Sequence, residues 1–294
     1  MAAPIDTSAR LRAELDRLAS AVASVDLGTG EGSTKQRHRE GVVTSVRGYL
    51  LPRLTSPRSP LLLAFVGPTG SGKSTMVNSL AGKTVSPAGP LRPTTSSPLV
   101  WAKDTVPHVQ IDGVTSVTVT GDDPLLDHFV IVDTPDLDST ARDHREQALA
   151  IAERADSIVF VTSATRYADA VPWRVLGRLA DRKVVVIPVL NRLSRRTSGA
   201  FIDYQRMLRE AGVGEEAIIS IQEHRMRGNR SILPSSAIKG LRHRLEDLAS
   251  KPDDVVDRVV RGTVADVVRR ARLVSSELSE VIAAVEKASV DRDS

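Results

Sequence analysis

The chain contains no cysteine and few aromatic residues, and both absences narrow its chemistry. Without cysteine there is no disulfide, no thiol nucleophile and no thiolate metal site. Aromatic residues make up only 3% of the 294 residues, although hydrophobic residues reach 41%. The core must therefore be filled by valine, leucine, isoleucine and alanine, and the length suits one large domain or a medium domain with additions.

Long apolar runs are also missing. None approaches the roughly 18 consecutive apolar residues that cross a bilayer. The first segment, from Met1 to Ser20, is charged and amphipathic and lacks the apolar stretch of a secretory signal. These features predict a cytoplasmic protein, with peripheral attachment at the inner face of the membrane as an alternative.

Charge gives little evidence for a nucleic-acid partner. Basic residues exceed acidic ones only by 40 to 36, and arginine (32) far outnumbers lysine (8), which reflects genome composition. No basic patch is interleaved with aromatic residues, so nucleic-acid binding is not expected. A loose basic cluster lies between Lys35 and Arg58. A solvated helix face explains it, and an anionic membrane surface is the alternative.

The strongest positive feature is the segment GPTGSGKST, from Gly67 to Thr75, which fits the phosphate-binding pattern G-x-x-x-x-G-K-[ST]. An apolar run at 61–66 predicts a strand before it, and residues 75–80 predict a helix after it. Glycines let the backbone aim successive N–H groups at one anion, and the helix N-terminus adds its dipole. The predicted nucleotide-binding residues here are Gly67, Gly70, Ser71, Gly72, Lys73, Ser74 and Thr75, with Lys73 on the β- and γ-phosphates.

A second group of residues is predicted to hold Mg²⁺ and support hydrolysis. Asp133-Thr134-Pro135-Asp136 directly follows the predicted strand 129–132, and an aspartate there suits Mg²⁺ binding through a water. A threonine of the loop 86–98, Thr95 or its neighbour Thr94, would complete the coordination while the γ-phosphate is bound. The predicted metal ligands are Ser74, Thr95 and Asp133, and the predicted catalytic residues are Lys73, Thr95, Asp133 and Asp136.

Residues 59–250 alternate strand-like and helix-like segments. Apolar runs at 61–66, 129–132, 158–162 and 184–190 predict buried parallel strands, and helices are predicted near 142–154, 172–181 and 205–211. This alternation predicts a doubly wound, mostly parallel α/β sheet with its ligand at the carboxyl ends of the strands. Two segments are predicted to frame a base: Asn191-Arg192, and Ser236-Ala237 after a predicted strand at Ile232-Leu233.

The flanks, residues 1–58 and 251–294, are predicted to be helical. Apolar residues recur at spacings of three and four over 7–26 and again from Pro252 onward, and a second helix is expected at about 34–54. The apolar stripe of the long C-terminal helix includes Val256, Val260, Val264 and Val267. We expect it to form a bundle with the N-terminal helices; packing on the sheet core is the alternative.

Five motifs in this order resemble the GTPase domain of the translation-factor class. They are the phosphate loop, Arg92-Pro93-Thr94-Thr95, Asp133-Thr134-Pro135, Asn191-Arg192 and Ser236-Ala237-Ile238-Lys239. The second motif and Asn78-Ser79-Leu80 are similar to bacterial dynamin-like GTPases and their Era/TrmE-type relatives. The resemblance implies a P-loop fold, GTP and GDP as ligands, and Mg²⁺ as cofactor. It also implies a homodimer or a dynamin-like paralogue as partner, and in many members an anionic membrane surface.

Three positions depart from the family pattern. Asp136 stands where the family has a glycine whose N–H meets the γ-phosphate. Leu137 occupies the place of the water-orienting glutamine of small GTPases, which predicts slow hydrolysis by an isolated monomer. Ser194 replaces the aspartate that accepts two hydrogen bonds from guanine, so discrimination against ATP should weaken. A GTPase is predicted; a nucleotide-gated scaffold with little hydrolysis and an ATPase are the alternatives.

Overall fold

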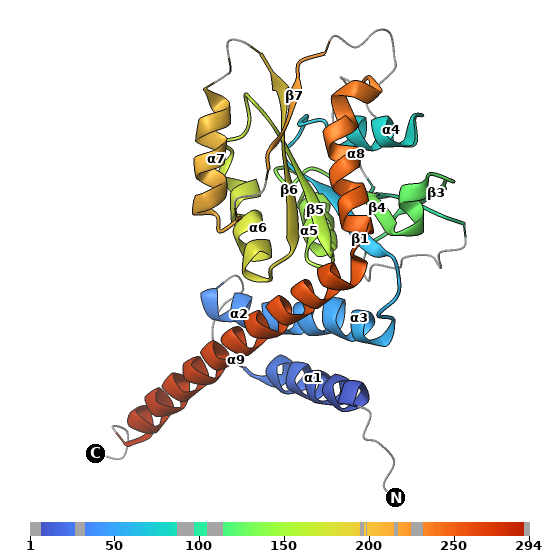
Figure 1. Cartoon of the computed structure of the whole chain (residues 1–294). Helices are drawn as coiled ribbons and strands as arrows, with labels where there is room; N and C mark the ends of the chain where they lie inside the picture. The colour runs from blue at the N-terminus through green and yellow to red at the C-terminus, as the bar shows by residue number, and fades with distance from the viewer. Residues whose placement is uncertain are drawn as a thin grey trace, which may run out of the picture. The chain divides into compact units, whose positions relative to one another are not determined.

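The computed structural model describes residues 7–26, 33–86, 97–104, 114–194, 197, 199–214, 217–224 and 232–290. The chain divides into two compact units (Figure 1). One comprises Met1–Ser59 and Val260–Ser294, and the other comprises Pro60–Val259. Each unit has its own buried residues and is described separately.

The larger unit is built on a seven-stranded sheet with the order β3-β2-β4-β1-β5-β6-β7. The strands are β1 (Leu61–Val66), β2 (Leu99–Ala102), β3 (Val117–Thr120), β4 (Phe129–Asp133), β5 (Ser157–Ser163), β6 (Val185–Leu193) and β7 (Ile219–Gln222). Every neighbouring pair is parallel except β2 with β4. The prediction of a mostly parallel α/β sheet is confirmed.

Burial explains which strands the sequence revealed. Every residue of β1, β4 and β5 is buried, and strands buried on both faces must be continuously apolar. Neither β2 nor β3 was predicted, because both are only four residues long and β3 is largely exposed. The strand predicted at Ile232-Leu233 was wrong: these residues form no strand, and the last strand among the described residues is β7, at Ile219–Gln222.

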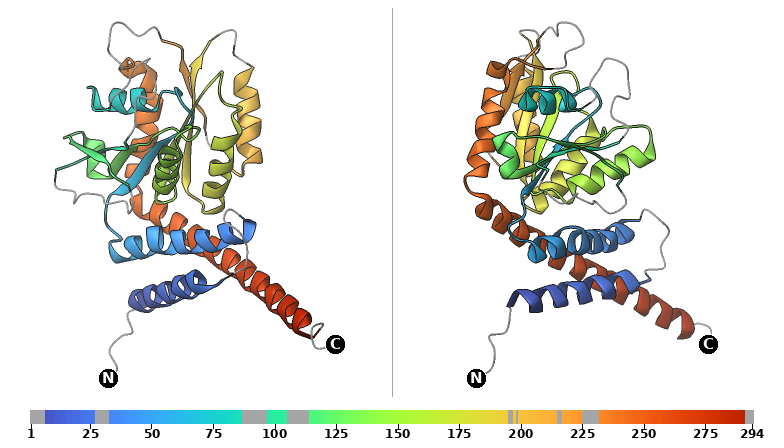
Figure 2. Two further views of the ribbon diagram at one scale, coloured as in Figure 1. Left: turned by 180° about the vertical axis from the view of Figure 1, so that it is seen from behind. Right: turned by 90° about the vertical axis from the view of Figure 1, so that its right-hand side faces the viewer.

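Helices cover both faces of this sheet (Figure 2). They are α4 (Lys73–Ala81), α5 (Arg142–Ala152), α6 (Ala170–Asp181), α7 (Ala200–Glu210) and α8 (Ser235–Ala249), with a short 3₁₀ helix, η2 (Pro124–Asp127). The helices predicted near 142–154, 172–181 and 205–211 correspond to α5, α6 and α7, and the last begins five residues earlier than expected. Apolar residues of α4 and α8 pack against alternate residues of β1 in one core: Met76, Leu80, Ile238, Leu241, Leu61, Leu63 and Phe65.

Three of the few aromatic residues join separate elements. Phe160 of β5, Trp173 of α6 and Tyr204 of α7 form one cluster, with ring centroids 5.5, 5.7 and 6.5 Å apart. The Trp173 indole N–H also donates to the backbone oxygen of Tyr167, at 2.5 Å. Aromatic pairs at such distances stabilise beyond their buried area, so this cluster holds α6 and α7 on the sheet.

The smaller unit is helical. It contains α1 (Thr7–Ser24), α2 (Thr34–Ser45), a π-helical turn η1 (Val46–Leu50), α3 (Leu51–Thr55) and most of α9 (Pro252–Val290). The three middle segments are contiguous and confirm the helix predicted at about 34–54. The π turn lies just before Pro52, which has no N–H to donate to the helix.

Side-chain contacts join α2 to α9 within this unit. His38 Nδ1 lies 3.2 Å from the Glu277 carboxylate, and a Cβ on Gly41 would lie 2.5 Å from the Arg270 guanidinium. The predicted apolar stripe of α9 is confirmed only in part: Val267 and Val274 are buried, whereas Val256, Val260 and Val264 are only half-buried. The buried valines are Val255, Val259, Val267 and Val274. Of the described helices, none has a stretch apolar and long enough to cross a bilayer.

Candidate nucleotide site

The predicted phosphate loop, residues 67–72, connects β1 to α4. Gly67, Gly70 and Gly72 have φ angles of 155°, 69° and 107°, a range that favours glycine. A Cβ on Gly67 would lie 1.9 Å from the Val161 carbonyl oxygen, and one on Gly72 would lie 2.5 Å from Asn191 Nδ2. Gly72 is the N-cap residue of α4 and has no side chain that could accept a hydrogen bond from the first N–H groups of the helix. These N–H groups are therefore available to an anion. The loop therefore needs glycine for both conformation and space.

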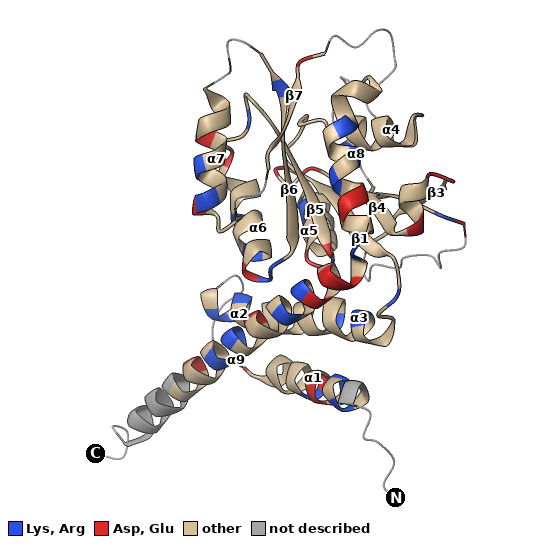
Figure 3. Ribbon diagram, in the orientation of Figure 1, with Lys and Arg blue, Asp and Glu red and all other residues tan. Residues whose placement is uncertain are grey.

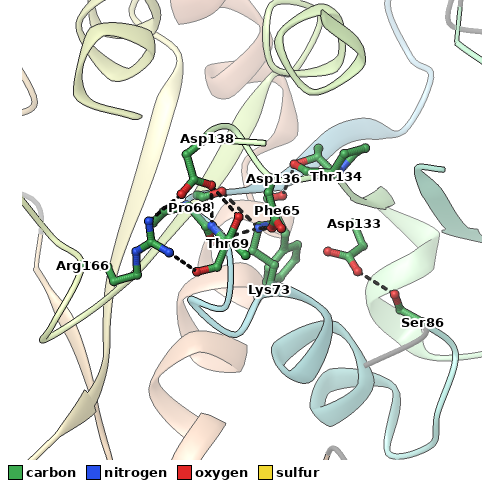
Figure 4. Close-up of polar contacts among 12 residues, drawn as sticks. Phe65, Pro68, Thr69, Lys73, Ser86, Asp133, Thr134, Asp136, Asp138 and Arg166 are labelled. Carbon is green, nitrogen blue, oxygen red and sulfur yellow. Dashed lines mark hydrogen bonds and ion pairs between the residues drawn. The ribbon is translucent and has the colours of Figure 1, made fainter. Parts of the chain in front are cut away.

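Lys73, in the first turn of α4, has its ammonium group inside this loop. Its side chain is 5% exposed, and Nζ donates to the backbone oxygens of Gly67 (3.1 Å) and Pro68 (3.3 Å). It also forms an ion pair with Asp136 Oδ1 at 2.5 Å, seen in Figure 4. The carboxylate at the family's glycine position is thus turned toward the charge that would meet the phosphates.

Asp133, the last residue of β4, is fully buried. Its Oδ2 accepts a hydrogen bond from Ser86 Oγ at 2.6 Å, whereas Oδ1 has no hydrogen-bond partner among the described residues. Burial raises the pKa of Asp133, and it outweighs the lowering by the hydroxyls of Ser74 and Ser86 and by the charge of Lys73. A buried carboxylate oxygen left without a partner fits a hydrated cation.

The donor set fits Mg²⁺ held jointly by protein and nucleotide. Nowhere in the described ranges do three or more His, Asp or Glu side chains gather into a metal site. Mg²⁺ ordinarily uses one or two carboxylates together with substrate phosphates. Ser74 and Asp133 would be its protein ligands here. Thr94 and Thr95 lie outside the described residues.

The base side of the site is organised by Asn191, near the end of β6. Its Nδ2 donates to the Ser71 backbone oxygen at 2.8 Å, and its Oδ1 accepts from the Arg192 N–H at 2.8 Å. Arg192 itself has a left-handed backbone, with φ of 57°. A cavity of about 190 Å³ lies beside these residues and the phosphate loop. Its lining residues are Gly72, Thr75, Asn191, Arg192, Gln222, Glu223, His224 and Leu233.

The second segment that was predicted to contact the base lies outside this cavity. Ser236 and Ala237 occupy the first turn of α8, and neither lines this cavity. Gln222, Glu223 and His224, which follow or end β7, line it instead. The structure thus brings Asn191 and Arg192 to the phosphate loop, and it brings there a segment that was not predicted.

Residues 62–192 match the family model described as 50S ribosome-binding GTPase. This segment is a P-loop GTPase domain. It contains the phosphate loop, the Asp133 motif and Asn191-Arg192 in one continuous stretch, in agreement with the resemblance noted from the sequence.

Several solved structures are similar to this chain. One of an oligomerised bacterial dynamin pair is 12% identical, has a TM-score of 0.51, and covers 100% of this chain and 51% of that chain. Era from Aquifex aeolicus bound to GDP and AlF₄⁻ is 20% identical, with a TM-score of 0.42 and coverages of 65% and 56%.

A third similar structure is Toc33 from Arabidopsis thaliana with Mg²⁺ and GMPPNP. It is 18% identical, with a TM-score of 0.44, and covers 74% of this chain and 95% of that chain. At these identities the likeness concerns the fold alone. The chain spans about half the length of the Era and dynamin structures that it matches. No curated protein matches the sequence.

Within the GTPase domain, the loop after β4 is hydrogen-bonded both to β1 and to the phosphate loop. Thr134 Oγ1 donates to the Phe65 backbone oxygen at 2.8 Å, and the Leu137 N–H donates to the Gly67 oxygen at 3.2 Å. The Leu137 side chain is buried, so this position has no polar group that could orient an attacking water. Slow hydrolysis by the isolated monomer stays a prediction.

Asp138 and Arg166, which were not predicted as site residues, hold the tip of the phosphate loop in the GTPase domain. Asp138 Oδ1 accepts hydrogen bonds from the Thr69 N–H (2.6 Å) and Oγ1 (2.8 Å). Arg166 pairs with Asp138 Oδ2 at 2.7 Å and donates to the Thr69 oxygen at 3.3 Å (Figure 4). Arg166 also pairs with Asp169, at 2.7 Å. No spacing in the sequence relates these positions, because they come from three separate loops.

Proposed function

We propose that this chain binds GTP together with Mg²⁺ and hydrolyses it, as a dynamin-like GTPase whose turnover is slow in the monomer and rises on dimerisation. The observation that carries this proposal is the convergence of Lys73 and Asp133 on one loop. The lysine supplies a buried cation, and the aspartate supplies a buried carboxylate oxygen with no described hydrogen-bond partner.

The chemistry of such a site is positioning and charge neutralisation. Backbone N–H groups of the loop and the ammonium of Lys73 would bind the phosphates, and Ser74 and Asp133 would hold the metal. Bound Mg²⁺ neutralises charge that develops on the phosphate oxygens during in-line attack by water. Leu137 cannot orient that water, so the water must be oriented by another group, from this chain or from a second copy.

A nucleotide-gated scaffold with little hydrolysis is the second candidate function. It is favoured by the Lys73–Asp136 ion pair, because a carboxylate on the phosphate-binding lysine opposes the binding and reaction of a triphosphate. In this alternative the bound nucleotide would change partner binding without turning over.

Phosphate release from GTP distinguishes the two candidates. We expect release that requires Mg²⁺ and whose rate per molecule rises with protein concentration. Lys73→Ala should lower the rate by roughly 100-fold, as expected when a preorganised charge is removed. The control Lys83→Ala removes an exposed lysine just after α4 and should leave the rate unchanged.

Three results would change the proposal. GTP binding without Mg²⁺-dependent release at any protein concentration would favour the scaffold. Absence of binding to any nucleotide would contradict both functions. A constant rate per molecule across all concentrations would remove the dimerisation step while leaving the GTPase in place.

Membrane association is proposed from the fold it shares with the bacterial dynamin pair, which is described as sensing and tethering membranes. The proposed partners are a second copy or a dynamin-like paralogue, and an anionic lipid surface. The basic cluster gives limited support: Arg37, Arg47 and Arg58 are exposed, but Arg53 is buried and donates to the Ser59 oxygen. Acidic and basic residues are mixed along the described part of α9 (Figure 3).

Co-sedimentation with phosphatidylserine vesicles, with and without GTP, tests this association. We expect binding to anionic vesicles and none to neutral phosphatidylcholine vesicles. Failure to sediment with either kind of vesicle in both nucleotide conditions would remove lipid from the proposal. Such a failure would leave the proposed GTP hydrolysis unaffected.

A further inference from the structure

We infer that Glu223 is the residue that selects guanine in this site, in place of the aspartate that Ser194 replaces. The inference rests on the proposed function, because it presupposes that a nucleotide binds to the phosphate loop. It assigns the base specificity to a residue at the end of β7, outside the stretch that matches the GTPase family model.

Ser194 is not placed to recognise a base. Its N–H donates to Thr197 Oγ1 at 2.9 Å, and its own hydroxyl lies 3.2 Å from the same oxygen. Thr197 Oγ1 also donates to the Ser194 backbone oxygen at 3.2 Å. These contacts close a local turn, and Ser194 does not line the cavity beside Asn191. The position of the family's aspartate is therefore occupied by a structural residue.

Glu223 reaches the same cavity from the neighbouring strand. Strands β6 and β7 are parallel, and Leu193 is paired with Gln222. The Glu223 N–H donates to the Leu193 backbone oxygen at 2.8 Å, which places Glu223 level with the carboxyl end of β6. Because parallel strands end at the same edge of a sheet, this placement sets Glu223 beside Asn191 and Arg192.

The cavity itself joins the base side to the phosphate side. Gly72 and Thr75 of the phosphate loop region form one part of its lining, and Asn191, Arg192 and Glu223 form another. Its volume of about 190 Å³ exceeds the roughly 150 Å³ of a cavity that admits benzene, so an aromatic base can enter. Among the described residues that line the cavity, Glu223 is the one carboxylate, and it forms no ion pair with a described cation.

Guanine and adenine differ in what they offer to a carboxylate. Guanine presents two adjacent donors, N1–H and the 2-amino group, whereas adenine presents an acceptor at N1 and no amino group at C2. An ionised carboxylate is an acceptor only, so it pairs with guanine and is left unpaired beside adenine. Arg192 lines the same cavity, and a planar guanidinium there would stack on a bound base.

Nucleotide titration of the full chain and of Glu223→Gln tests the inference. The wild-type protein should bind GTP at least tenfold more tightly than ATP in the presence of Mg²⁺. Glu223→Gln should weaken GTP binding by about tenfold or more, because a charge-assisted acceptor is replaced by a neutral one. The new amide N–H₂ should strengthen binding of XTP, whose base carries a carbonyl oxygen in place of the 2-amino group.

Glu246→Gln, an exposed position on α8, is the matched control and should change none of these affinities. A gain for XTP cannot result from misfolding, so this readout stays informative if GTP binding falls. Unchanged GTP and XTP affinities in Glu223→Gln would overturn the inference, as would equal wild-type affinities for GTP and ATP. Failure of the wild-type protein to bind any nucleotide would instead overturn the proposed function.

Discussion

The ion pair between Lys73 and Asp136 predicts a trade between stability and nucleotide affinity. In the proposed function the triphosphate would bind the ammonium of Lys73, which pairs here with the Asp136 carboxylate at 2.5 Å. Asp136→Asn removes the competing charge and retains the size of the side chain. We therefore expect this variant to bind GTP more tightly and to be less stable without nucleotide.

The magnitude follows from the burial of the pair. A hydrogen bond to a charged group is worth about 1.5–3 kcal/mol. Asp136 is 23% exposed, so the lower end of this range applies, equivalent to a gain of roughly tenfold in affinity. The same substitution leaves Lys73, which is 5% exposed, with only backbone carbonyls as partners. The free energy of unfolding should fall by about 1–2 kcal/mol.

Two measurements test this trade. Titration calorimetry with a non-hydrolysable GTP analogue gives the affinity, and thermal unfolding without nucleotide gives the stability. Asp127→Asn is a suitable control, because Asp127 forms a more exposed ion pair with Lys103 in the same unit and should alter neither quantity appreciably. Weaker binding of the analogue by Asp136→Asn would refute the reasoning, since it would mean that the carboxylate assists the nucleotide.

Three further predictions concern single side chains. In thermal unfolding, Asp133→Asn should lose most of the stabilisation that GTP gives in the presence of Mg²⁺. Without ligand the variant should be no less stable than the wild type, because the substitution removes a fully buried charge. A response to GTP and Mg²⁺ equal to that of the wild type would contradict this prediction. Arg166→Ala leaves Asp138, 15% exposed, without its cation, and should lower the free energy of unfolding by about 1–2 kcal/mol. A double-mutant cycle with Asp138→Ala should show non-additivity, and purely additive effects would show that the pair is not coupled. The hydrogen bonds of Arg206 and Tyr167 lower the pKa of Asp203, so its stabilisation is present above pH 3.8 and is lost as the pH falls through the lowered folded pKa. The melting temperatures of wild type and Asp203→Asn should therefore differ at neutral pH and converge in strong acid; a difference that persists in acid would have another cause.

The parts of the fold that could be predicted are those whose local sequence carries the whole physical requirement. Strands such as β1, β4 and β5 are buried on both faces, so each is a continuous apolar run. The phosphate loop could also be predicted from a continuous stretch of sequence, because its glycines, Lys73 and Ser74 must be neighbours to surround one anion. Asp133 could be placed because it directly follows the predicted strand 129–132.

Other features depend on which elements lie side by side, and no local pattern records that. Val255-Val256 and Val259-Val260 are adjacent valine pairs, and only packing decides that the first of each pair is buried. The edge strand β3 is largely exposed and short, so its sequence lacks an apolar run.

The site shows the same division between sequence and tertiary structure. The sequence by itself determined the phosphate-loop motif with Lys73 and predicted Asp133 as the metal-binding carboxylate, because each signal is written in consecutive residues. Only the tertiary structure decided that Asp136 pairs with Lys73 and that Asp138 and Arg166 hold Thr69. It also decided that Glu223 meets Asn191 at one cavity, because that encounter depends on the parallel pairing of β6 with β7.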